Sequence, residues 1–345
     1  MRSLAIIESP FQLLSLVEAK NYFKINDLTV IIKYTNNPKT NNQIDWMLNH
    51  NSFTKVIKLP KFNKITLNDF VLIFLIFKWK LSQKKFNHIF IGEPRSLIMT
   101  SFLLNFKYLK YYFLDDGSVT IVLQNKVIND DLSFYEDSEK SLINTFRKIV
   151  MKVLGIKYTF KQIPTFFSCF NLNAVKNQEI IKHNFENISQ LVEVKEINIL
   201  PKVYFIGGNL SEGKAMQEVF ELELFTKIVK YYKKKGQKII YCCHRRESSE
   251  KLEKIKKIDP TLELYFPEFP IELEFIIKKI SIQNIGSYCS TALYTSTLIF
   301  KPKESIMFKI PSEYLLNQFK KEFQDLEINY TDNKFIQLEK EYSNS

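Results

Sequence analysis

The chain has few of the residues on which small cross-linked or metal-bound folds depend. Its 345 residues include only four cysteines, eight glycines and two tryptophans. The cysteines show neither metal-ligand spacing nor a plausible set of pairs, which excludes a zinc-binding module and a disulfide framework. Cys242 and Cys243 are adjacent in an apolar run, as expected of buried thiols in a reducing compartment.

Long hydrophobic segments and the usual phosphate-binding loops are missing too. The longest apolar run, residues 70–77, is far too short to cross a bilayer. The chain begins with the strand-like residues 4–7 and shows no charged segment followed by a signal-peptide core, so we expect a cytoplasmic protein. Neither GxGxxG nor GxxxxGK followed by Ser or Thr occurs, which excludes the common glycine-rich phosphate loops.

Positive charge is in excess. The formal net charge is +12, with 45% hydrophobic and 25% charged residues, and lysines cluster at 230–235. Such a surface favours polyanions, anionic membranes or anionic substrates, although a lysine-rich coding bias would give the same excess. Lysines also follow the apolar run 70–77. That run is therefore either a buried helix or an interfacial helix at the inner face of a membrane.

Short apolar runs alternate with helical patterns, which predicts βαβ units and parallel sheets. We expect a first α/β domain over residues 1–160, closed by a helix at 138–153, and a second over 201–310. Residues 161–200 lack clear periodicity and are predicted to connect the two. The tail 311–345 contains a helical pattern and is predicted to pack back on the first domain.

Two adjacent carboxylates, Asp115 and Asp116, follow the apolar run 111–114 and precede Gly117. Paired acids are poor material for a buried strand end, because burial and mutual repulsion both oppose their charge. Ligands of open α/β sheets bind at the carboxyl ends of strands, and a carboxylate with a raised pKa can serve there as a general base. The alternatives are an ordinary Asp-Gly turn between strands and a Mg²⁺ site, for which no further carboxylate pair is evident.

The second domain offers three polar groups at predicted strand ends. His244, Arg245 and Arg246 follow the strand 238–242 and suit a phosphate, unless they form a solvated loop in which Glu247 pairs with an arginine. Ser290 or Thr291 caps a helix after the predicted strand 281–285, and its free N–H groups favour an anion. Glu268 or Glu272 could hold ribose hydroxyls, or could simply complement a helix dipole.

These motifs carry a family resemblance. The order Asp-Asp-Gly, His-Arg and a Ser/Thr-rich turn resembles bacterial sialyltransferases of GT-B type, namely lipooligosaccharide sialyltransferases and capsular polysialyltransferases, which use CMP-sialic acid. The segments Ile-Glu-Ser-Pro-Phe-Gln-Leu-Leu at 7–14 and Phe-Ile-Gly-Gly-Asn-Leu-Ser-Glu at 205–212 are also similar to that group. His244-Arg245 stands where relatives often have His-Pro. The resemblance implies a GT-B fold of two Rossmann-like domains that face each other across a cleft.

The resemblance also implies roles for individual residues. The first domain would bind the acceptor, with Asp115 as the general base and Asp116 orienting its loop. The second would bind the nucleotide sugar, with His244 on the CMP phosphate. The remaining acceptor-side residues would be Glu8, Ser9, Gln12, Glu93, Arg95 and Gly117, and the remaining donor-side residues Gly207, Gly208, Asn209, Arg245, Glu268, Glu272, Ser287, Ser290 and Thr291.

The resulting expectation is a metal-independent, inverting glycosyltransferase without a cofactor beyond its CMP-sugar donor. It would transfer sialic acid to a glycan or glycolipid, such as lipooligosaccharide or capsular polysaccharide. Transfer from another CMP-activated acid (Kdo, legionaminic or pseudaminic acid) or from a nucleotide-diphosphate sugar is the enzymatic alternative. A basic nucleic-acid-binding or membrane-binding protein and an inactive scaffold are the others. The lysines do not form a recognisable nucleic-acid module, so we expect no nucleic-acid partner.

Overall fold

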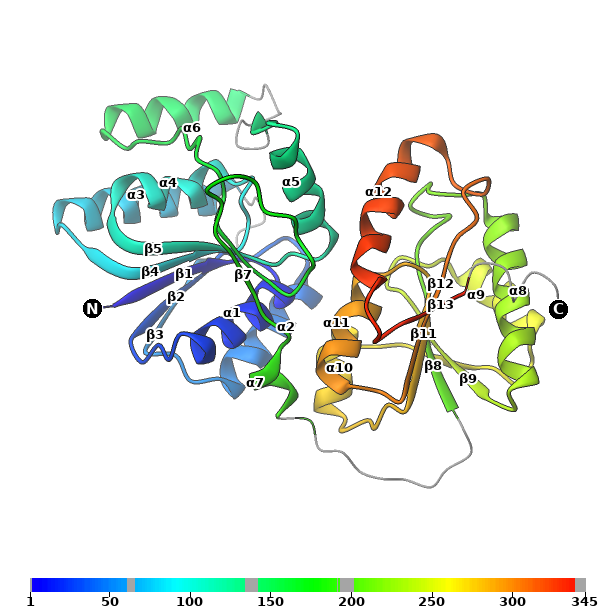
Figure 1. Ribbon diagram of the computed structural model, residues 1–345. Helices are drawn as coiled ribbons and strands as arrows, with labels where there is room; N and C mark the ends of the chain where they lie inside the picture. Colours follow the sequence, from blue (N-terminus) through cyan, green and yellow to red (C-terminus); the bar gives the residue numbers. More distant parts are fainter. Residues whose placement is uncertain (1, 61–65, 134–141, 191, 193–201, 339–345) are drawn as a thin grey trace. The chain divides into compact units, whose positions relative to one another are not determined.

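The computed structural model describes residues 2–60, 66–133, 142–190, 192 and 202–338 (Figure 1). The chain divides into unit 1, residues 1–183, and unit 2, residues 184–345. Each unit contains one sheet whose strands are all parallel. The prediction of two α/β domains with parallel sheets is therefore confirmed.

Unit 1 has a seven-stranded sheet in the order β3-β2-β1-β4-β5-β6-β7. Helices α1 and α2 cover one face, and α3 and α4 cover the other (Figure 1). Central strands β1 and β2 are buried along their whole length, as parallel strands covered on both faces must be. The elements are β1 (Ser3–Ile7), α1 (Pro10–Tyr22), β2 (Leu28–Ile32), α2 (Pro38–His50), β3 (Lys55–Lys58), α3 (Thr66–Leu81), β4 (Lys85–Ile91), α4 (Leu97–Asn105), β5 (Lys107–Leu114), α5 (Ser118–Ile128), α6 (Leu142–Val153), β6 (Phe166–Ser168) and β7 (Ile180–Lys182).

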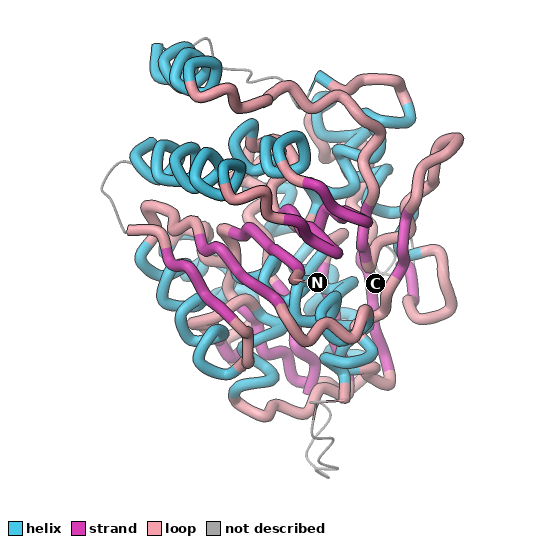
Figure 2. The backbone as a smooth tube through the Cα atoms, turned by 90° about the vertical axis from the view of Figure 1, so that its left-hand side faces the viewer, coloured by secondary structure: helices cyan, strands magenta, loops and turns pink. Residues whose placement is uncertain are grey.

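Unit 2 has a six-stranded sheet in the order β10-β9-β8-β11-β12-β13. Figure 2 shows the strands and helices of the chain from a second direction. The elements are α7 (Glu186–Ser189), β8 (Lys202–Ile206), α8 (Glu218–Lys234), β9 (Lys238–Cys242), α9 (Ser249–Ile258), β10 (Glu263–Tyr265), α10 (Ile271–Ile277), β11 (Asn284–Ser287), α11 (Thr291–Phe300), β12 (Glu304–Phe308), α12 (Asn317–Glu327), the 3₁₀ turn η2 (Ile328–Tyr330) and β13 (Ile336–Leu338).

Both sheets share the strand order 3-2-1-4-5 about their first strand, which is that of Rossmann-like domains. The direction in which strands are added reverses between β1 and β4 in unit 1, and between β8 and β11 in unit 2. Loops diverge at such a switch point, which opens a ligand site at the carboxyl ends of the strands. The topology therefore directs attention to the residues that follow β1, β4, β8 and β11.

Two predicted boundaries need correction. Strands β6 and β7 complete the first sheet, so unit 1 extends through residue 183 rather than ending at 160. Strand β13 pairs with β12, so the tail contributes a strand to the second sheet, and unit 2 extends beyond the predicted limit of 310. That the tail packs back on the first domain stays a prediction. Some residues of the predicted segments lie outside the described part of the chain. They are 191 and 193–200 of the connecting region, 138–141 of the helix at 138–153, and the chain end 339–345.

Helix α1 begins at Pro10, and Ser9 caps it by accepting a hydrogen bond from the Gln12 amide. Helix α5 was not predicted. It begins directly after Gly117, whose positive φ of 64° few other residues adopt, and it carries little helical periodicity. None of the helices in the described part of the chain has the length and apolar content that crossing a membrane requires.

Close packing at Gly286 generates a stability prediction. This glycine lies in β11, and a Cβ there would overlap the hydroxyl of Tyr232, which is fully buried on α8. We expect Gly286→Ala to lower the free energy of unfolding by about 1–3 kcal/mol through overpacking. Tyr232→Phe removes the hydroxyl and leaves the ring carbon Cζ at 3.3 Å from the new methyl, so the double variant should recover most of the loss. Urea unfolding of the four proteins in this cycle checks the prediction, and additive losses would contradict it.

Candidate functional site

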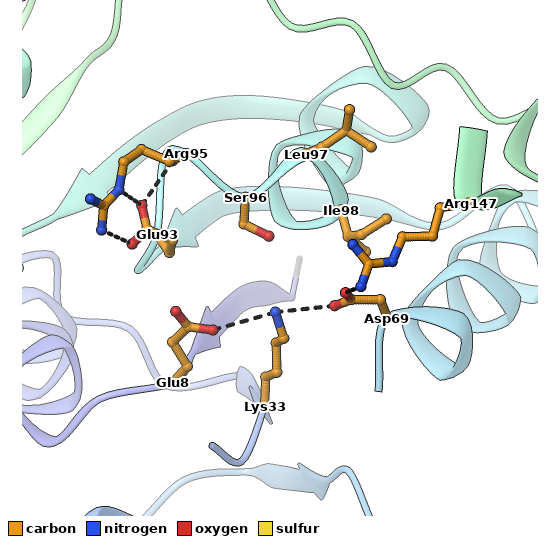
Figure 3. A pocket seen from close by; sticks show the side chains of 9 residues that line it. All are labelled: Glu8, Lys33, Asp69, Glu93, Arg95, Ser96, Leu97, Ile98 and Arg147. Atoms are coloured by element: carbon orange, nitrogen blue, oxygen red, sulfur yellow. Dashed lines mark hydrogen bonds and ion pairs between the residues drawn. The ribbon is translucent and has the colours of Figure 1, made fainter. Parts of the chain in front are cut away.

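A polar pocket of about 270 Å³ lies at the carboxyl edge of the first sheet (Figure 3). Its walls come from residues that follow β1, β2 and β4, from the N-terminal turns of α3 and α4, and from α6. The residues that line it are Glu8, Lys33, Asp69, Glu93, Arg95, Ser96, Leu97, Ile98 and Arg147. The volume is close to the lower limit for small-ligand sites.

A chain of ion pairs crosses this pocket (Figure 3). The Lys33 Nζ lies 3.5 Å from a carboxylate oxygen of Glu8 and 3.0 Å from one of Asp69, and Arg147 lies 2.7 Å from Asp69. Burial opposes the charge on Lys33, but Glu8 and Asp69 outweigh it and raise the lysine pKa. Lys33 is thus a fixed cation that connects the loop after β1 with the start of α3.

Three carboxylates meet at the ends of the adjacent strands β1, β4 and β5. Burial raises the pKa of Glu8, as do the charges of Glu93 and Asp116, although Lys33 works against this. Burial likewise raises the pKa of Asp116, and the charge of Glu93 adds to the effect. Glu93 itself binds Arg95 through two hydrogen bonds, 2.8 Å from Nε and 2.5 Å from Nη2. A proton taken up at this edge is therefore held more tightly than by an isolated carboxylate.

Asp116 is the partly exposed member of the Asp115-Asp116 pair. Its Oδ1 accepts a hydrogen bond of 3.1 Å from the Ser9 hydroxyl, and its amide donates one of 3.0 Å to Thr120 Oγ1. The loop after β1 and the first turn of α5 therefore hold the carboxylate in place at the sheet edge. The structure thus brings together the predicted acceptor-side residues Glu8, Ser9, Glu93 and Arg95 with Asp116. Gln12 supports this loop by accepting a hydrogen bond of 2.8 Å from the Glu8 amide.

Asp115, in contrast, is completely buried. Its carboxylate accepts hydrogen bonds of 2.6 Å from the Ser168 hydroxyl and 2.7 Å from the Cys169 amide, and it lies 3.6 Å from Nε2 of the buried His183. These contacts join the end of β5 to the ends of β6 and β7. Asp115 thus holds this sheet edge together, and Asp116 is the acid of the pair that remains partly exposed. The assignment of the general base stays a prediction.

In unit 2 a fully buried lysine organises the carboxyl edge. Lys251, in the first turn of α9, lies 2.6 Å from Glu221, 3.1 Å from Glu212 and 3.2 Å from Glu247, and it donates 2.9 Å to the Gly208 carbonyl. Burial opposes its charge, but Glu221 and Glu247 outweigh burial and raise the lysine pKa. One cation thereby ties the loop after β8, helix α8 and the loop after β9 into one unit.

Glu247 connects the Lys251 network with His244. It accepts hydrogen bonds of 2.6 Å from the His244 amide and 2.6 Å from the Tyr241 hydroxyl. A Cβ at Gly207 would collide with the Tyr241 hydroxyl at 2.6 Å, so Gly207 is a glycine because of this ring. The alternative in which Glu247 pairs with an arginine is not seen, because its partners are Lys251, Tyr241 and the His244 amide.

His244 is an uncharged hydrogen-bond donor at neutral pH. Burial lowers its pKa to about 4, and the charges of Arg245 and Arg246 add to the effect. Its Nδ1 lies 3.2 Å from the Arg246 amide, which must donate, so the ring proton sits on Nε2. The predicted cationic cluster is therefore corrected: Arg245 and Arg246, both exposed, carry its charge, and His244 offers a neutral N–H.

The N-terminus of α11 follows β11, at the switch point of the second sheet. Ser290 occupies the N-cap position, but its hydroxyl makes no capping hydrogen bond. The amides of Thr291 and Ala292 find no acceptor among the described backbone groups. Tyr330 from η2 accepts from the Ser290 amide at 3.1 Å and donates to the Ser290 carbonyl, which fixes this turn. These amide donors thus lie at the sheet edge where the loops that carry Gly208, Asn209 and His244 also begin.

Three predicted donor-side residues have structural partners instead. The Ser287 hydroxyl is buried and donates 2.7 Å to the Ile206 carbonyl, which joins β11 to β8. Glu272 is 4% exposed and accepts a hydrogen bond from Thr295, which joins α10 to α11, and burial raises its pKa. Glu268 is exposed in the loop before α10, so of the two predicted ribose acids it is the accessible one. Gly207, as described, accommodates Tyr241.

Sequence analysis missed the residues that hold the loops: Lys33, Asp69, Arg147, Glu212, Glu221, Lys251 and Tyr330. One signal was present, because Lys251 lies four residues before the buried Ile255 on the same side of α9. The others depend on partners 30 or more residues away. Among the described residues, no group of three or more His, Cys, Asp or Glu side chains is placed to hold a metal ion.

The Lys251 network generates the second prediction. Lys251→Met leaves Glu212, Glu221 and Glu247 without their shared cation, so we expect the free energy of unfolding to fall by about 3–5 kcal/mol at pH 7. Burial already raises the pKa of Glu247 against the opposing effect of Lys251, so loss of the lysine should raise it further above its unfolded value. Protonation of Glu247 then favours the folded state, and the deficit should shrink as the pH is lowered toward 5. Denaturant titrations at several pH values measure it.

Lys254→Met is the matched control, three residues along the same helix. Lys254 pairs with Glu218 on the surface, where about half of the lysine side chain is exposed, and such pairs contribute about 0–1 kcal/mol. Equal losses in the two variants, or a Lys251→Met deficit that grows on acidification, would contradict the proposed role of the network.

Comparison with solved structures shows the fold. UDP-GlcNAc 2-epimerase from Methanocaldococcus jannaschii is 10% identical, with a TM-score of 0.53 over 99% of this chain and 90% of that one. S. aureus MnaA in a structure with UDP is 11% identical (TM-score 0.49, 90% and 80% covered). Acinetobacter baumannii MurG is 8% identical (TM-score 0.43, 98% and 86% covered). Two Rossmann-like domains, each with its own parallel sheet, make this a GT-B fold.

No curated protein sequence matches the chain significantly. The model of one protein family does match, and it is described as alpha-2,8-polysialyltransferase. The match runs from residue 3 to residue 309 and includes Asp116, His244, Ser290 and the Lys251 network. With the GT-B fold and the two polar sheet edges, this match shows that the chain belongs to the alpha-2,8-polysialyltransferase family and is a glycosyltransferase.

Proposed function

We propose that this glycosyltransferase transfers sialic acid, or a related nonulosonic acid, from a CMP-activated donor. The acceptor would be a cell-surface glycan such as lipooligosaccharide or capsular polysaccharide, and the configuration at the transferred carbon would be inverted. Family membership supports the reaction class. The observation that carries the donor proposal is the N-terminus of α11, where Ser290 lacks a capping hydrogen bond at the switch point of the second sheet.

The donor phosphate would bind at this N-terminus. The free amides of Thr291 and Ala292, the Ser290 hydroxyl and the helix dipole all favour an anion there. His244 follows β9, two strand positions from β11 and hence roughly 10 Å away along the edge. Its Nε2–H would donate to the phosphate oxygen that receives electrons as the glycosidic bond breaks. Arg245 and Arg246 add positive potential without occupying that position.

Asp116 would be the general base. In the reaction the acceptor hydroxyl oxygen bonds to the anomeric carbon of the donor, the bond from that carbon to the phosphate oxygen breaks, and CMP leaves with the electron pair. The proton of the hydroxyl passes to Asp116. The raised pKa of this carboxylate, caused by burial and by Glu93, brings it closer to neutral pH, which suits a base. The adjacent pocket would receive the acceptor sugar.

This arrangement supplies charge stabilisation at the phosphate and a base at the acceptor. An oxocarbenium-like transition state needs these two contributions more than it needs a strong nucleophile. We propose that no metal takes part, and transfer should then persist in EDTA. Loss of transfer in EDTA with recovery in Mg²⁺ would assign the carboxylates of the first sheet edge to a metal instead.

The donor proposal predicts selective stabilisation by CMP. At a hundredfold excess over its Kd, CMP should stabilise the fold by about 3 kcal/mol, which thermal unfolding detects. His244→Ala should weaken CMP binding by about 1.5–3 kcal/mol, or roughly tenfold to a hundredfold, because a hydrogen bond to a charged group is lost. His244→Gln keeps a neutral N–H donor near the position of Nε2 and should retain part of the affinity.

UDP and ADP at equal concentration are the ligand controls. Stabilisation by UDP but not by CMP would overturn the sialyltransferase-like donor. Unchanged CMP affinity in His244→Ala, measured by calorimetry on folded protein, would remove His244 from the phosphate site and leave only the α11 N-terminus.

The base proposal distinguishes the two aspartates. Asp116→Asn should lower the rate of transfer by about 10²–10⁴-fold while CMP affinity stays unchanged. Asp115→Asn should instead lower the free energy of unfolding by about 1–3 kcal/mol, because it weakens the hydrogen bonds to Ser168 and Cys169, and should retain transfer where it is folded.

Ser168→Ala is the control for Asp115, since it removes one partner of that carboxylate without touching Asp116. Glu93→Gln tests the electrostatics, because removal of its charge should lower the Asp116 pKa and move the acid limb of kcat/KM to lower pH. A folded Asp115→Asn without transfer, together with an active Asp116→Asn, would return the base role to Asp115.

A further inference from the structure

Helix α6 presents an apolar stripe to solvent. Leu142, Phe146, Ile149 and Val153 follow one another at spacings of four, three and four residues, which places them on one face of the helix. They are 90%, 57%, 53% and 79% exposed. The opposite side of the helix is anchored, because Met151 is fully buried and Arg147 pairs with Asp69. Leu142, Ile149 and Val153 therefore project mainly into solvent, and Phe146 does so in part.

Helix α3 extends this apolar surface. Leu67, Phe74 and Leu81 recur every seven residues and are 45%, 58% and 70% exposed, while Leu72, Ile73 and Ile76 on the other side are fully buried. Phe70 contacts Phe146 with 5.6 Å between ring centroids, so the two helices are neighbours. Figure 1 shows α6 outermost on the side of the first sheet that α3 covers. We call this surface the α3–α6 face: Leu67, Phe74, Leu81, Leu142, Phe146, Ile149 and Val153.

The charged residues of the two helices are almost all cationic. Asp69 is the one acid on either helix, and it is buried in ion pairs with Lys33 and Arg147. The remaining charged side chains, apart from Arg147, are Lys78, Lys80 and Lys152, which are exposed, and Lys148, which is half-buried. Apolar side chains flanked by lysines, without an exposed acid on either helix, are typical of surfaces that lie in the interface of an anionic bilayer.

We propose that the α3–α6 face docks on an anionic lipid membrane, with its apolar side chains in the acyl–headgroup boundary and the lysines at the headgroups. The charge pattern selects this occupant. A second copy of the same face would bring lysines against lysines with no acid on either helix to pair them. On an anionic surface each lysine contributes about 1 kcal/mol instead. This inference does not depend on the identity of the donor or on the catalytic residues.

Vesicle flotation with the full chain tests the docking. The protein should float with vesicles that contain 25% phosphatidylglycerol in phosphatidylcholine, and binding should fall in 0.5 M NaCl because salt screens the lysines. Leu142→Ser/Val153→Ser should lower the partition coefficient at least tenfold, since two side chains no longer enter the boundary. Lys78→Glu/Lys152→Glu should lower it further for anionic vesicles.

Leu109→Ser/Val219→Ser is the matched control, because these side chains are 69% and 61% exposed on other elements. It should bind vesicles like the unaltered protein, and circular dichroism should show all variants folded. Flotation of Leu142→Ser/Val153→Ser equal to that of the control would overturn the proposal, as would failure of the unaltered protein to bind anionic vesicles. A dimer in gel filtration that only Leu142→Ser/Val153→Ser abolishes, without vesicle binding, would assign the face to self-association instead.

Discussion

A buried lysine shared by two or more carboxylates stands at the carboxyl edge of each sheet. Lys33 connects Glu8 with Asp69 in unit 1, and Lys251 connects Glu212, Glu221 and Glu247 in unit 2. Parallel strands end at this edge in separate loops, which lie beyond the hydrogen-bonded ladder of the sheet. A buried cation supplies the missing cross-links, because removal of any one partner would leave an uncompensated charge away from water. The positions of Asp116 and His244 depend on these loops.

The two edges differ in charge, and the difference suits the two halves of a transfer reaction. In unit 1 burial raises the pKa of Glu8 and of Asp116, and the charge of Glu93 adds to the effect on both. In unit 2 burial keeps His244 neutral, while the α11 N-terminus provides further donors. A carboxylate with a raised pKa accepts a proton readily, and a set of fixed N–H donors stabilises a developing anion. The same strand topology therefore supports opposite electrostatic tasks through the residues placed at its edge.

In unit 2, contacts with aromatic rings and with the chain's own tail fix the positions of His244 and Ser290. Gly207 leaves room for the Tyr241 ring, whose hydroxyl holds Glu247 and through it the His244 amide. Tyr330, near the end of the described chain, clamps Ser290 at the start of α11. The tail thus helps to position the proposed donor site, and β13 is part of the sheet that carries α11. A long-range hydrogen bond from a residue forty positions away determines where the free donors of α11 point.

The sequence by itself determined the fold class, the parallel sheets and most strand ends, because alternating apolar runs and helical periodicity are local properties. It also singled out Asp116, His244, Ser290 and Thr291, since polar residues after a buried strand have few purely structural uses. Only the tertiary structure shows that Asp115 is buried while Asp116 is partly exposed, because the partners of Asp115, Ser168 and Cys169, lie more than fifty residues away. The same holds for the neutral state of His244, the structural use of Ser287 and Glu272, and the strand at 336–338. The burial and the pKa of a side chain depend on the distant groups that surround it. The local periodicity of the sequence does not reveal which groups these are.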